Sequence, residues 1–179
     1  MVETLRLATL KSYGVLDTPA EAAFDAIAFE AARALHVPSA VVSFIDEDRQ
    51  WYKARFGVEA SFVPRAISFC THILDSDDVT VVADTRKDAR FLANPFVIGE
   101  PHIRFYAAAP IKALNRQRVG TVCVFDTEPR SGTSDRERRH LSALAARTVE
   151  LLEQRRWAER SRAAAMAAPR AAVVAQVGR

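Results

Sequence analysis

Two apolar runs of strand length, joined by a polar loop, constrain the fold of this chain more than any other feature. They cover residues 103–111 and 119–126, and the tip of the loop between them lies at residues 115–118. A polar loop between two such runs predicts a β-hairpin. Neither run alternates cleanly between apolar and polar residues, so both faces of each strand should be covered. Because an antiparallel pair commonly leaves one face to solvent, we expect an additional layer of helices or a ligand-holding layer.

The segments before this hairpin show helical and then strand patterns. Apolar spacing predicts a short helix over residues 3–13 and a second helix over about 20–35, with Asp17-Thr18-Pro19 as its start signal. Residues 40–45 and 50–56 predict a first hairpin with a charged turn between its strands. After an irregular stretch to Pro64, the sequence predicts a short helix at 67–74 and a strand at 79–82. Residues 84–101 contain chain breakers and predict a loop, with one helical turn near Arg90-Phe91.

A long final helix is predicted after the second hairpin. Ser134 and Glu137 have the spacing of a capping box, and the apolar residues that follow extend the helix to about Arg156. The structured domain is therefore expected over residues 1–156. Residues 157–179 are rich in Ala and Arg and predict a frayed helix and a disordered tail. Trp51 is expected in the core, and Trp157 is expected to pack in the helix layer.

Composition excludes several classes of function. The net charge is only +3, and five arginines between residues 155 and 170 account for much of the positive charge. Residues 1–150 show no basic cluster, so no nucleic-acid partner is expected. The chain has no apolar run long enough for a membrane span and no signal peptide. Its two cysteines, Cys70 and Cys123, are too few for a disulfide framework and predict reduced thiols in a cytoplasmic protein.

Five motifs occur in this order along the chain: Tyr13-Gly14-Val15-Leu16-Asp17-Thr18-Pro19, Asp46-Glu47-Asp48-Arg49-Gln50-Trp51, Ser68-Phe69-Cys70, Phe105-Tyr106-Ala107-Ala108-Ala109-Pro110 and Gly120-Thr121-Val122-Cys123-Val124-Phe125-Asp126. Together they resemble the GAF domain family, and more narrowly the GAF domains placed before bacterial diguanylate cyclase or histidine kinase modules. The resemblance implies an α+β, PAS-like fold: a central antiparallel sheet has the terminal helices on one face and pocket-forming loops and short helices on the other. Because no output module follows Arg156, we expect a free-standing module or adaptor.

The resemblance also implies a small-molecule pocket and suggests which residues line it. The candidate ligand-binding residues are Phe69, Cys70, His72, Asp84, Phe91, Arg104 and Tyr106. Converging polar groups in an apolar cavity orient a ligand, and an arginine can hold a phosphate or carboxylate. The alternative is that Asp84, Arg90 and Arg104 pair with one another and order the long loop. No cofactor can be named, and no metal or catalytic residues are expected.

The cysteines and His72 invite three further interpretations. Some GAF proteins reduce free methionine sulfoxide, but the cysteine pattern of those enzymes is not matched here, and Cys123 is expected as a small core residue. Phytochrome-like GAF domains attach bilin through a cysteine followed by histidine, whereas Thr71 separates Cys70 from His72. Zinc lacks enough ligands at a suitable spacing. We predict that Cys70 and Cys123 form no disulfide in the resting protein.

We therefore predict a non-enzymatic sensory or regulatory domain that binds an unidentified small molecule and acts on a signalling partner. The alternatives are a dimerisation adaptor with a vestigial pocket and a thiol oxidoreductase. A homodimer through the terminal helices is also expected, since Leu141, Leu144, Thr148 and Leu151 approximate a heptad seam and Leu7 and Leu10 offer a further apolar surface.

Overall fold

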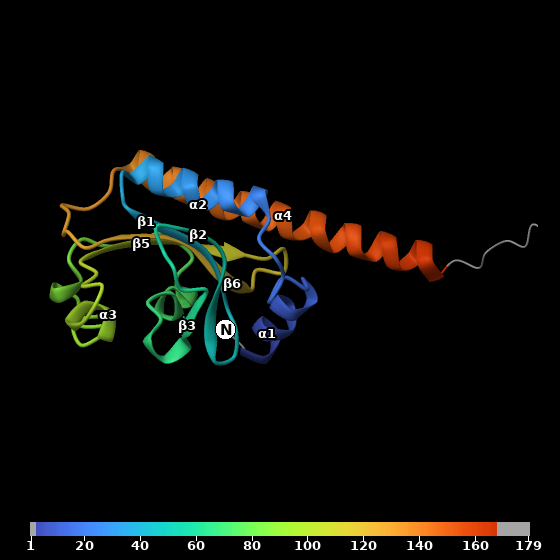
Figure 1. The fold of residues 1–179 in the computed structure, drawn as a ribbon, viewed down its shortest axis with the longest axis horizontal. Coiled ribbons are helices and arrows are strands. Elements are labelled where there is room, and N and C mark those ends of the chain that lie inside the picture. The colour runs from blue at the N-terminus through green and yellow to red at the C-terminus, as the bar shows by residue number, and fades with distance from the viewer. Residues whose placement is uncertain (1–2, 168–179) are drawn as a thin grey trace, which may run out of the picture.

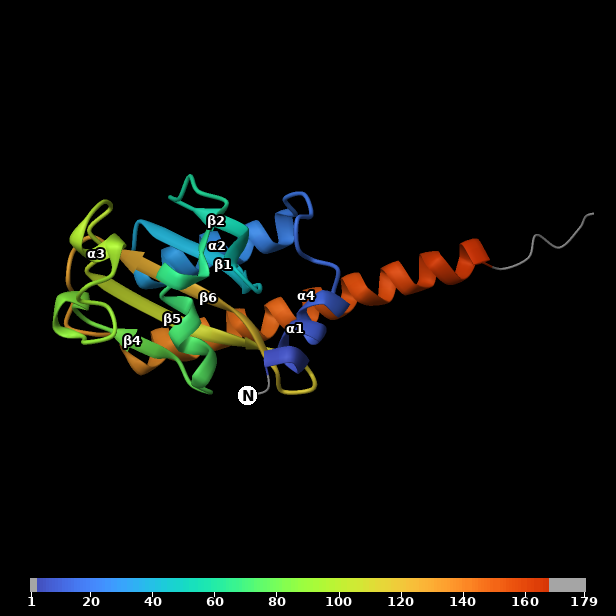
Figure 2. The ribbon, with the colours of Figure 1, turned by 90° about the horizontal axis from the view of Figure 1, so that it is seen from below.

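A computed structural model describes residues 3–167 as one antiparallel sheet between two layers (Figures 1 and 2). The sheet has six strands in the order β3-β2-β1-β6-β5-β4. Its strands are β1 (Ser39–Ile45), β2 (Arg49–Phe56), β3 (Phe62–Pro64), β4 (Thr80–Val82), β5 (Phe105–Lys112) and β6 (Arg118–Asp126). The helices are α1 (Glu3–Ser12), α2 (Ala22–Leu35), α3 (Pro95–Ile98) and α4 (Asp135–Ala167), with 3₁₀ helices η1 (Arg65–Ile67), η2 (Cys70–Asp75) and η3 (Thr85–Lys87). This arrangement confirms the predicted α+β fold class.

The hairpin that dominates the sequence forms the middle of the sheet. β5 and β6 pair with Ala109 opposite Val122, and β6 also pairs with β1. Phe105, Val122 and Val124 are fully buried, as predicted. Figure 1 shows α2 and α4 on one face of the sheet and η2, α3 and the connecting loops on the other. Cover on both faces explains why the strands carry apolar residues at consecutive positions.

Alternate side chains of the sheet enter two separate apolar clusters. Val42, Val122 and Val124 face α2 and α4, where they meet residues such as Phe24 and Leu141. The neighbouring positions point the opposite way, since successive side chains of a strand lie on opposite faces. These include Val41, Tyr106, Ala108 and Cys123, which meet residues of η2 and α3. The second face is the one on which the resemblance placed a pocket.

The two long helices begin differently. At α4, the Glu137 carboxylate accepts hydrogen bonds from the Ser134 backbone N–H at 2.6 Å and its hydroxyl at 2.7 Å, which confirms the capping box. The expected start signal of α2 is wrong: α2 begins after Glu21, which makes no side-chain cap. Asp17 instead adopts a left-handed φ of 58° and accepts a hydrogen bond from Arg49 at 2.7 Å. A tertiary ion pair therefore replaces the local cap.

Two short elements in the middle of the chain were not expected. The predicted helical turn near Arg90-Phe91 is present, since the Leu92 N–H donates to the Asp88 carbonyl at 3.0 Å. A separate short helix, α3, follows at Pro95–Ile98, because Asn94 caps it by accepting from the Phe96 N–H at 2.9 Å and Pro95 occupies its first turn. β3 falls within the stretch expected to be irregular. Three residues are too few to show a strand pattern, and β3 exists because it pairs with β2.

Helix α4 continues to Ala167, so the expectation of a frayed segment directly after Arg156 is wrong for residues 157–167. Residues 157–167 contain no Gly or Pro and are mostly strong helix formers. Residues 168–179, where the remainder of the expected tail lies, are outside the described residues. Figure 1 shows α4 running well past the edge of the sheet. Trp157 is 73% exposed and does not pack in the helix layer as predicted.

The expected dimer seam is largely used within the chain. Leu141, Leu144 and Thr148 are buried in the domain, and Leu151 is half-buried. Leu10 of α1 is also fully buried. Those side chains are not free to form an interface. Among residues 3–167, none of the helices combines the length and the apolarity that a bilayer crossing requires.

Candidate functional site

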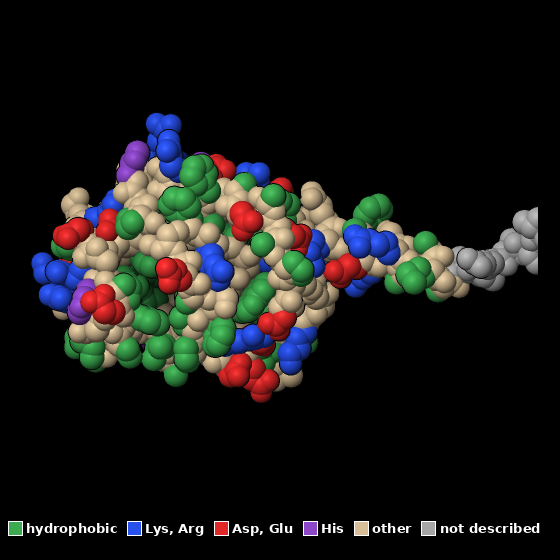
Figure 3. All heavy atoms as spheres, viewed as in Figure 1, with side chains coloured by type: hydrophobic (Ala, Val, Ile, Leu, Met, Phe, Trp, Pro, Cys, Tyr) green, Lys and Arg blue, Asp and Glu red, His purple; other side chains and the backbone are tan. Residues whose placement is uncertain are grey.

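A cavity of about 310 Å³ lies on the face of the sheet opposite α2 and α4. Figure 3 shows its opening as a hollow lined by hydrophobic side chains between α3 and β3. Strands β1, β2, β5 and β6 form its floor, and the segments around η2, α3 and the β2–β3 loop form its walls. Its apolar lining includes Val41, Val58, Val63, Phe69, Phe96, Ile103 and Phe125. Its volume lies at the small end of the range for ligand pockets.

The β2–β3 loop is brought over the sheet at Gly57. Gly57 has a φ of +66°, and a Cβ placed on it would lie 2.1 Å from the Pro38 carbonyl oxygen. Ser39 donates a hydrogen bond from its hydroxyl to the Gly57 carbonyl at 3.2 Å. The close approach fixes the rim of the pocket between the start of β1 and the end of β2.

The charged lining is sparse and acidic. Glu59 and Asp126 are the charged side chains among the described lining residues, which include no Lys or Arg. Asp126 is neutralised by Arg130, whose Nη2 lies 2.7 Å from its carboxylate. The pocket therefore offers no cation to an anionic ligand.

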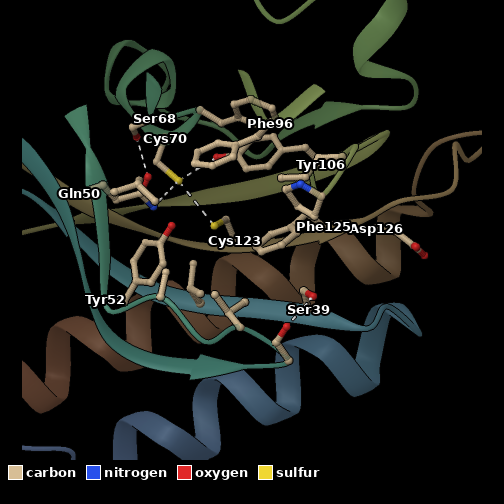
Figure 4. A pocket seen from close by; sticks show the side chains of 18 of the residues that line it. Ser39, Gln50, Tyr52, Ser68, Cys70, Phe96, Tyr106, Cys123, Phe125 and Asp126 are labelled. Atoms are coloured by element: carbon tan, nitrogen blue, oxygen red, sulfur yellow. Dashed lines mark hydrogen bonds between the residues drawn. The ribbon is translucent and has the colours of Figure 1, made fainter. Parts of the chain in front are cut away.

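The thiol of Cys70 lies at the centre of the polar part of the pocket floor. Cys70 Sγ lies 3.0 Å from Gln50 Nε2, 3.1 Å from the Tyr106 hydroxyl and 3.5 Å from Cys123 Sγ (Figure 4). All four side chains are at most 3% exposed. They come from η2, β2, β5 and β6, so the sheet assembles the group from distant parts of the sequence.

Gln50 and its neighbours extend this polar group into the sheet. Its amide nitrogen also donates to Ser43 Oγ at 2.9 Å, and its amide oxygen accepts from Ser68 Oγ at 2.6 Å. Ser43 in turn lies 3.2 Å from Thr121 Oγ1. Buried polar groups are stable when each has a partner, and here the partners are mutual. The Tyr52 hydroxyl points into the pocket (Figure 4) and has no hydrogen-bond partner among the described residues.

The two thiols share this environment unequally. Burial opposes ionisation of Cys70, but hydrogen bonds with its neighbours, Cys123 first among them, outweigh it and lower the pKa of Cys70 to about 7. The same hydrogen bond, together with burial, raises the pKa of Cys123 well above its ordinary value. Burial likewise raises the pKa of Tyr106. The pair therefore ionises first at Cys70, while Cys123 and Tyr106 keep their protons.

The sequence profile of the GAF domain family matches residues 19–151. The chain belongs to the GAF domain family. A cyclic di-GMP phosphodiesterase of Pseudomonas aeruginosa is 38% identical over 135 residues, which are 75% of this chain and 23% of that protein. The chain thus spans about a quarter of the length of this curated relative.

Solved structures share the fold of this GAF domain. The GAF domain of an Acinetobacter phosphoenolpyruvate-protein phosphotransferase gives a TM-score of 0.63 at 16% identity, covering 85% of this chain and 93% of that one. The blue-light absorbing PixJ GAF domain of Thermosynechococcus elongatus gives 0.61 at 15% identity, covering 92% and 96%. A type II free methionine-R-sulfoxide reductase of Thermoplasma acidophilum gives 0.59 at 12% identity, covering 73% and 89%. At these identities the likeness concerns the fold alone.

The structure of this GAF domain separates the predicted ligand-binding residues into two groups. Phe69, Cys70 and Tyr106 line the cavity, and His72, Asp84, Phe91 and Arg104 do not. Phe91 is fully buried behind the wall, with its ring centroid 4.6 Å from that of Phe69. His72 is exposed and lies edge-on against Phe91. Both residues support the wall from outside.

Asp84 and Arg104 hold each other instead of a ligand. Arg104 Nε and Nη2 each donate to the Asp84 carboxylate at 2.9 Å. Arg104 lowers the pKa of Asp84 to about 2. Arg90 takes no part, because it donates to the neighbouring Asp88 at 2.6 Å. The alternative that these charges pair to order the loop is thus correct for Asp84 and Arg104 and wrong for Arg90.

Sequence reasoning missed Gln50, Tyr52 and Ser68 as lining residues. A glutamine at the start of an apolar strand is a signal for a buried polar partner, but its position beside Cys70 depends on the packing of η2. Cys123 is a buried strand residue, as expected, and it also lines the pocket. Both cysteines are free thiols in this structure. Within residues 3–167, no three His, Cys, Asp or Glu side chains gather as metal ligands.

Proposed function

We propose that this GAF domain is a sensory module that binds a small, uncharged and mostly apolar molecule in the pocket and reports its occupancy to a partner protein, without catalytic turnover. The cavity itself carries this proposal: it combines an apolar lining with a few convergent polar groups, which is the usual composition of a ligand pocket. Tyr52 adds a hydroxyl that is free to bind a ligand. A reducing cytoplasm would keep both thiols free.

The charge of the lining decides the class of ligand. Cyclic di-GMP, for which the Pseudomonas aeruginosa relative is named, carries two phosphate charges that need cationic or backbone donors. The described lining has no Lys or Arg, and its one unpaired charge is the carboxylate of Glu59. Burying an unpaired anion in such a pocket is strongly unfavourable. We therefore propose a neutral ligand, and no role for this pocket in binding cyclic di-GMP.

An ion pair and hydrogen bonds connect the pocket wall to α4 and support a route for the signal. Arg65 of η1 donates to Glu3 of α1 at 2.6 Å and to the Asp46 carbonyl at 3.1 Å. At the other end of the α1 segment, Tyr13 donates to Glu153 of α4 at 2.7 Å. A ligand that moves η1 would therefore pull on α1, and α1 would pull on α4.

A matched pair of fluorescent probes tests the neutral pocket. N-phenyl-1-naphthylamine should bind with enhanced fluorescence and raise the melting temperature. The same ring system with an added sulfonate, 8-anilinonaphthalene-1-sulfonate, should bind at least about tenfold more weakly, because its charge finds no partner. Cyclic di-GMP should leave the melting temperature unchanged. Titration of each compound by fluorescence and differential scanning calorimetry checks these results.

Two variants locate the binding. Val58 is half-buried at the mouth of the cavity, so Val58→Trp should block it and remove binding of N-phenyl-1-naphthylamine. Leu114 is 73% exposed on the distant β5–β6 hairpin, and Leu114→Trp should bind like wild type. Equal binding by Val58→Trp and wild type, or equal affinity for the neutral and sulfonated probes, would contradict the proposal.

Homodimerisation through α4 is a second candidate property, favoured by the part of the helix that projects past the sheet. Residues 157–167 are exposed except for the half-buried Ala158, and Trp157 is 73% exposed. A projecting helix without packing is only marginally stable in water. A second copy would cover it with two-fold symmetry. This interface replaces the seam at Leu141, Leu144 and Thr148, which the domain buries itself.

Light scattering at micromolar concentration should give twice the chain mass for the full-length protein. Trp157→Ala should shift the mass toward one chain, because the largest apolar side chain of the projecting segment is lost. Ile98→Ala is the control, since Ile98 is 68% exposed and lies on α3, on the opposite face of the sheet from α4. A single-chain mass for wild type would reject the dimer.

A further inference from the structure

The two cysteines lie at the floor of the pocket in an arrangement that packing alone does not require. Their sulfurs are 3.5 Å apart, although the residues are 53 positions apart in the sequence. Cys123 is fixed in the middle of the sheet, where it pairs with Val41 on one side and Ala108 on the other. Cys70 begins the 3₁₀ helix η2, which packs on the sheet from outside. One sulfur is therefore fixed by strand pairing on both sides, and the other lies on a short 3₁₀ helix that no strand pairing holds.

The chemistry around Cys70 favours a reactive thiolate. Gln50 donates to its sulfur at 3.0 Å, and the Tyr106 hydroxyl, which can donate to a thiolate, lies at 3.1 Å. Both cysteines line the cavity, although each is at most 2% exposed, so a small molecule that enters the pocket lies next to them (Figure 4). Thiolate character together with access determines which cysteines oxidise, and a second thiol beside the first can resolve the product.

We propose that Cys70 and Cys123 form a redox site in which a small organic hydroperoxide, entering the apolar pocket, oxidises the two thiols to an intramolecular disulfide. This covalent input goes beyond the reversible ligand of the proposed function and does not require it. It is a stoichiometric modification of the chain, which a cellular thiol reductant reverses.

The reaction proceeds in two balanced steps. The Cys70 thiolate attacks the terminal oxygen of ROOH, the O–O bond breaks, and the alkoxide leaves and takes a proton to become ROH, with Tyr106 as the nearest donor. Cys70 is then a sulfenic acid. The Cys123 thiol attacks its sulfur, the S–S bond forms, and the hydroxyl leaves with the thiol proton as water. In total the two thiols lose two hydrogens, and ROOH is reduced to ROH and water.

The disulfide would change the pocket wall. Bonding requires the sulfurs to approach well inside their present separation, and Cys70 is the partner that can move. Its contacts with Gln50 and Tyr106 would be lost or rearranged. Thr71, the next residue, donates from its N–H to Ser68 Oγ at 3.2 Å and from its hydroxyl to the Arg65 carbonyl at 3.3 Å. Oxidation would therefore displace the same wall that Arg65 connects to α1.

Thiol counting in the full-length protein tests the site. The reduced protein is exposed to cumene hydroperoxide, quenched, denatured and labelled with N-ethylmaleimide for intact mass measurement. The count should fall from two labels to none in a chain that remains a monomer on a non-reducing gel, and dithiothreitol should restore both. Hydrogen peroxide has no apolar group to bury in the cavity, so it should react at least about tenfold more slowly. This factor corresponds to the free energy of burying roughly two methylene groups.

Two nearly isosteric variants assign the steps. Cys123→Ser should stop at the Cys70 sulfenic acid, which dimedone traps. In Cys70→Ser, the remaining Cys123 thiol should not be oxidised and should still take up one N-ethylmaleimide label. Three results would overturn the proposal. The wild-type protein could keep both labels under conditions that oxidise free cysteine, or it could form a covalent dimer. The third is that Cys70→Ser loses its remaining thiol as fast as the wild-type protein does. Thiol loss without binding of N-phenyl-1-naphthylamine would reject only the proposed ligand, and binding without thiol loss would reject only the redox site.

The oxidation rate should depend on pH through Cys70. The titratable groups that face it are Cys123 on β6, Tyr106 on β5 and Tyr52 on β2, and all three keep their protons near neutrality because their pKa values are raised. The pKa of Cys70 is lowered to about 7. Since the thiolate is the reactive form, the rate should rise with pH, reach half its maximum near pH 7 and level off above it. A rate that rises only near pH 9 would assign the reaction to an ordinary thiol.

Discussion

Replacing Val122 with aspartate should leave this GAF domain largely unfolded at room temperature. Val122 is fully buried in β6, between Val42 of β1 and Ala109 of β5, and faces the apolar layer formed by α2 and α4. Lys53 and Arg130, which contact aromatic rings of this layer, are already paired with Glu21 and Asp126. The free energy of unfolding should fall by roughly 5 kcal/mol or more, because a buried carboxylate without a partner loses its hydration and gains nothing. Chemical denaturation followed by circular dichroism measures the loss.

The matched control is Val122→Ala, which removes two methyl groups without adding a charge. It should lower the free energy of unfolding by about 1–3 kcal/mol, through lost transfer energy and a small cavity. A stability for Val122→Asp equal to that of Val122→Ala would mean that the side chain reaches solvent, and the burial of β6 between two layers would be wrong. The pocket lies on the other face, so Val122→Ala should bind N-phenyl-1-naphthylamine like wild type.

The central sheet was predictable because its signals are local. The two apolar runs that form β5 and β6 carry enough apolar residues on both faces to require cover, and their polar loop sets the turn. The capping box of α4 is equally local, since Ser134 and Glu137 satisfy each other three residues apart. Such signals survive in the sequence because no distant residue is needed to complete them.

The pocket was predictable only in its location. Arg104 and Asp84 had the chemistry of ligand-binding groups, but a bidentate ion pair between them satisfies both. The sequence does not distinguish a charged side chain that is available to a ligand from one that is paired with a residue twenty positions away. Gln50 shows the converse, because its role follows from the packing of η2 against β2. These outcomes depend on tertiary contacts, for which one sequence gives no pattern.

The end of α4 was mispredicted for a related reason. An apolar stripe indicates where a helix packs, and the stripe stops near Arg156, so the prediction ended the helix there. Helix propensity continues through the alanines and arginines to Ala167. The projecting segment is thus a helix without a covering partner within the described chain, which is why its exposed Trp157 bears on assembly and not on the core.

A second large effect is expected at the rim of the pocket, because the backbone around Gly57 leaves no room for a side chain. Gly57→Ala should lower the free energy of unfolding by roughly 2–4 kcal/mol and weaken binding of N-phenyl-1-naphthylamine. A left-handed φ of +66° costs a residue with a Cβ about 1–2 kcal/mol. The new Cβ would also lie 2.1 Å from the Pro38 carbonyl oxygen, a backbone atom that cannot turn aside. Strands β1 and β2 must then separate at the mouth of the cavity.

Gly14→Ala provides the control for the backbone strain alone. Gly14 has a similar φ of +56°, but its added Cβ would meet the Glu159 carboxylate at 3.2 Å, the far end of a flexible side chain. It should cost about 1–2 kcal/mol and leave probe binding unchanged, because Gly14 is not a lining residue. Denaturation curves and probe titrations of both variants separate the two effects. If Gly57→Ala cost no more than Gly14→Ala and bound the probe like wild type, the close approach of Gly57 to Pro38 would not hold the pocket rim.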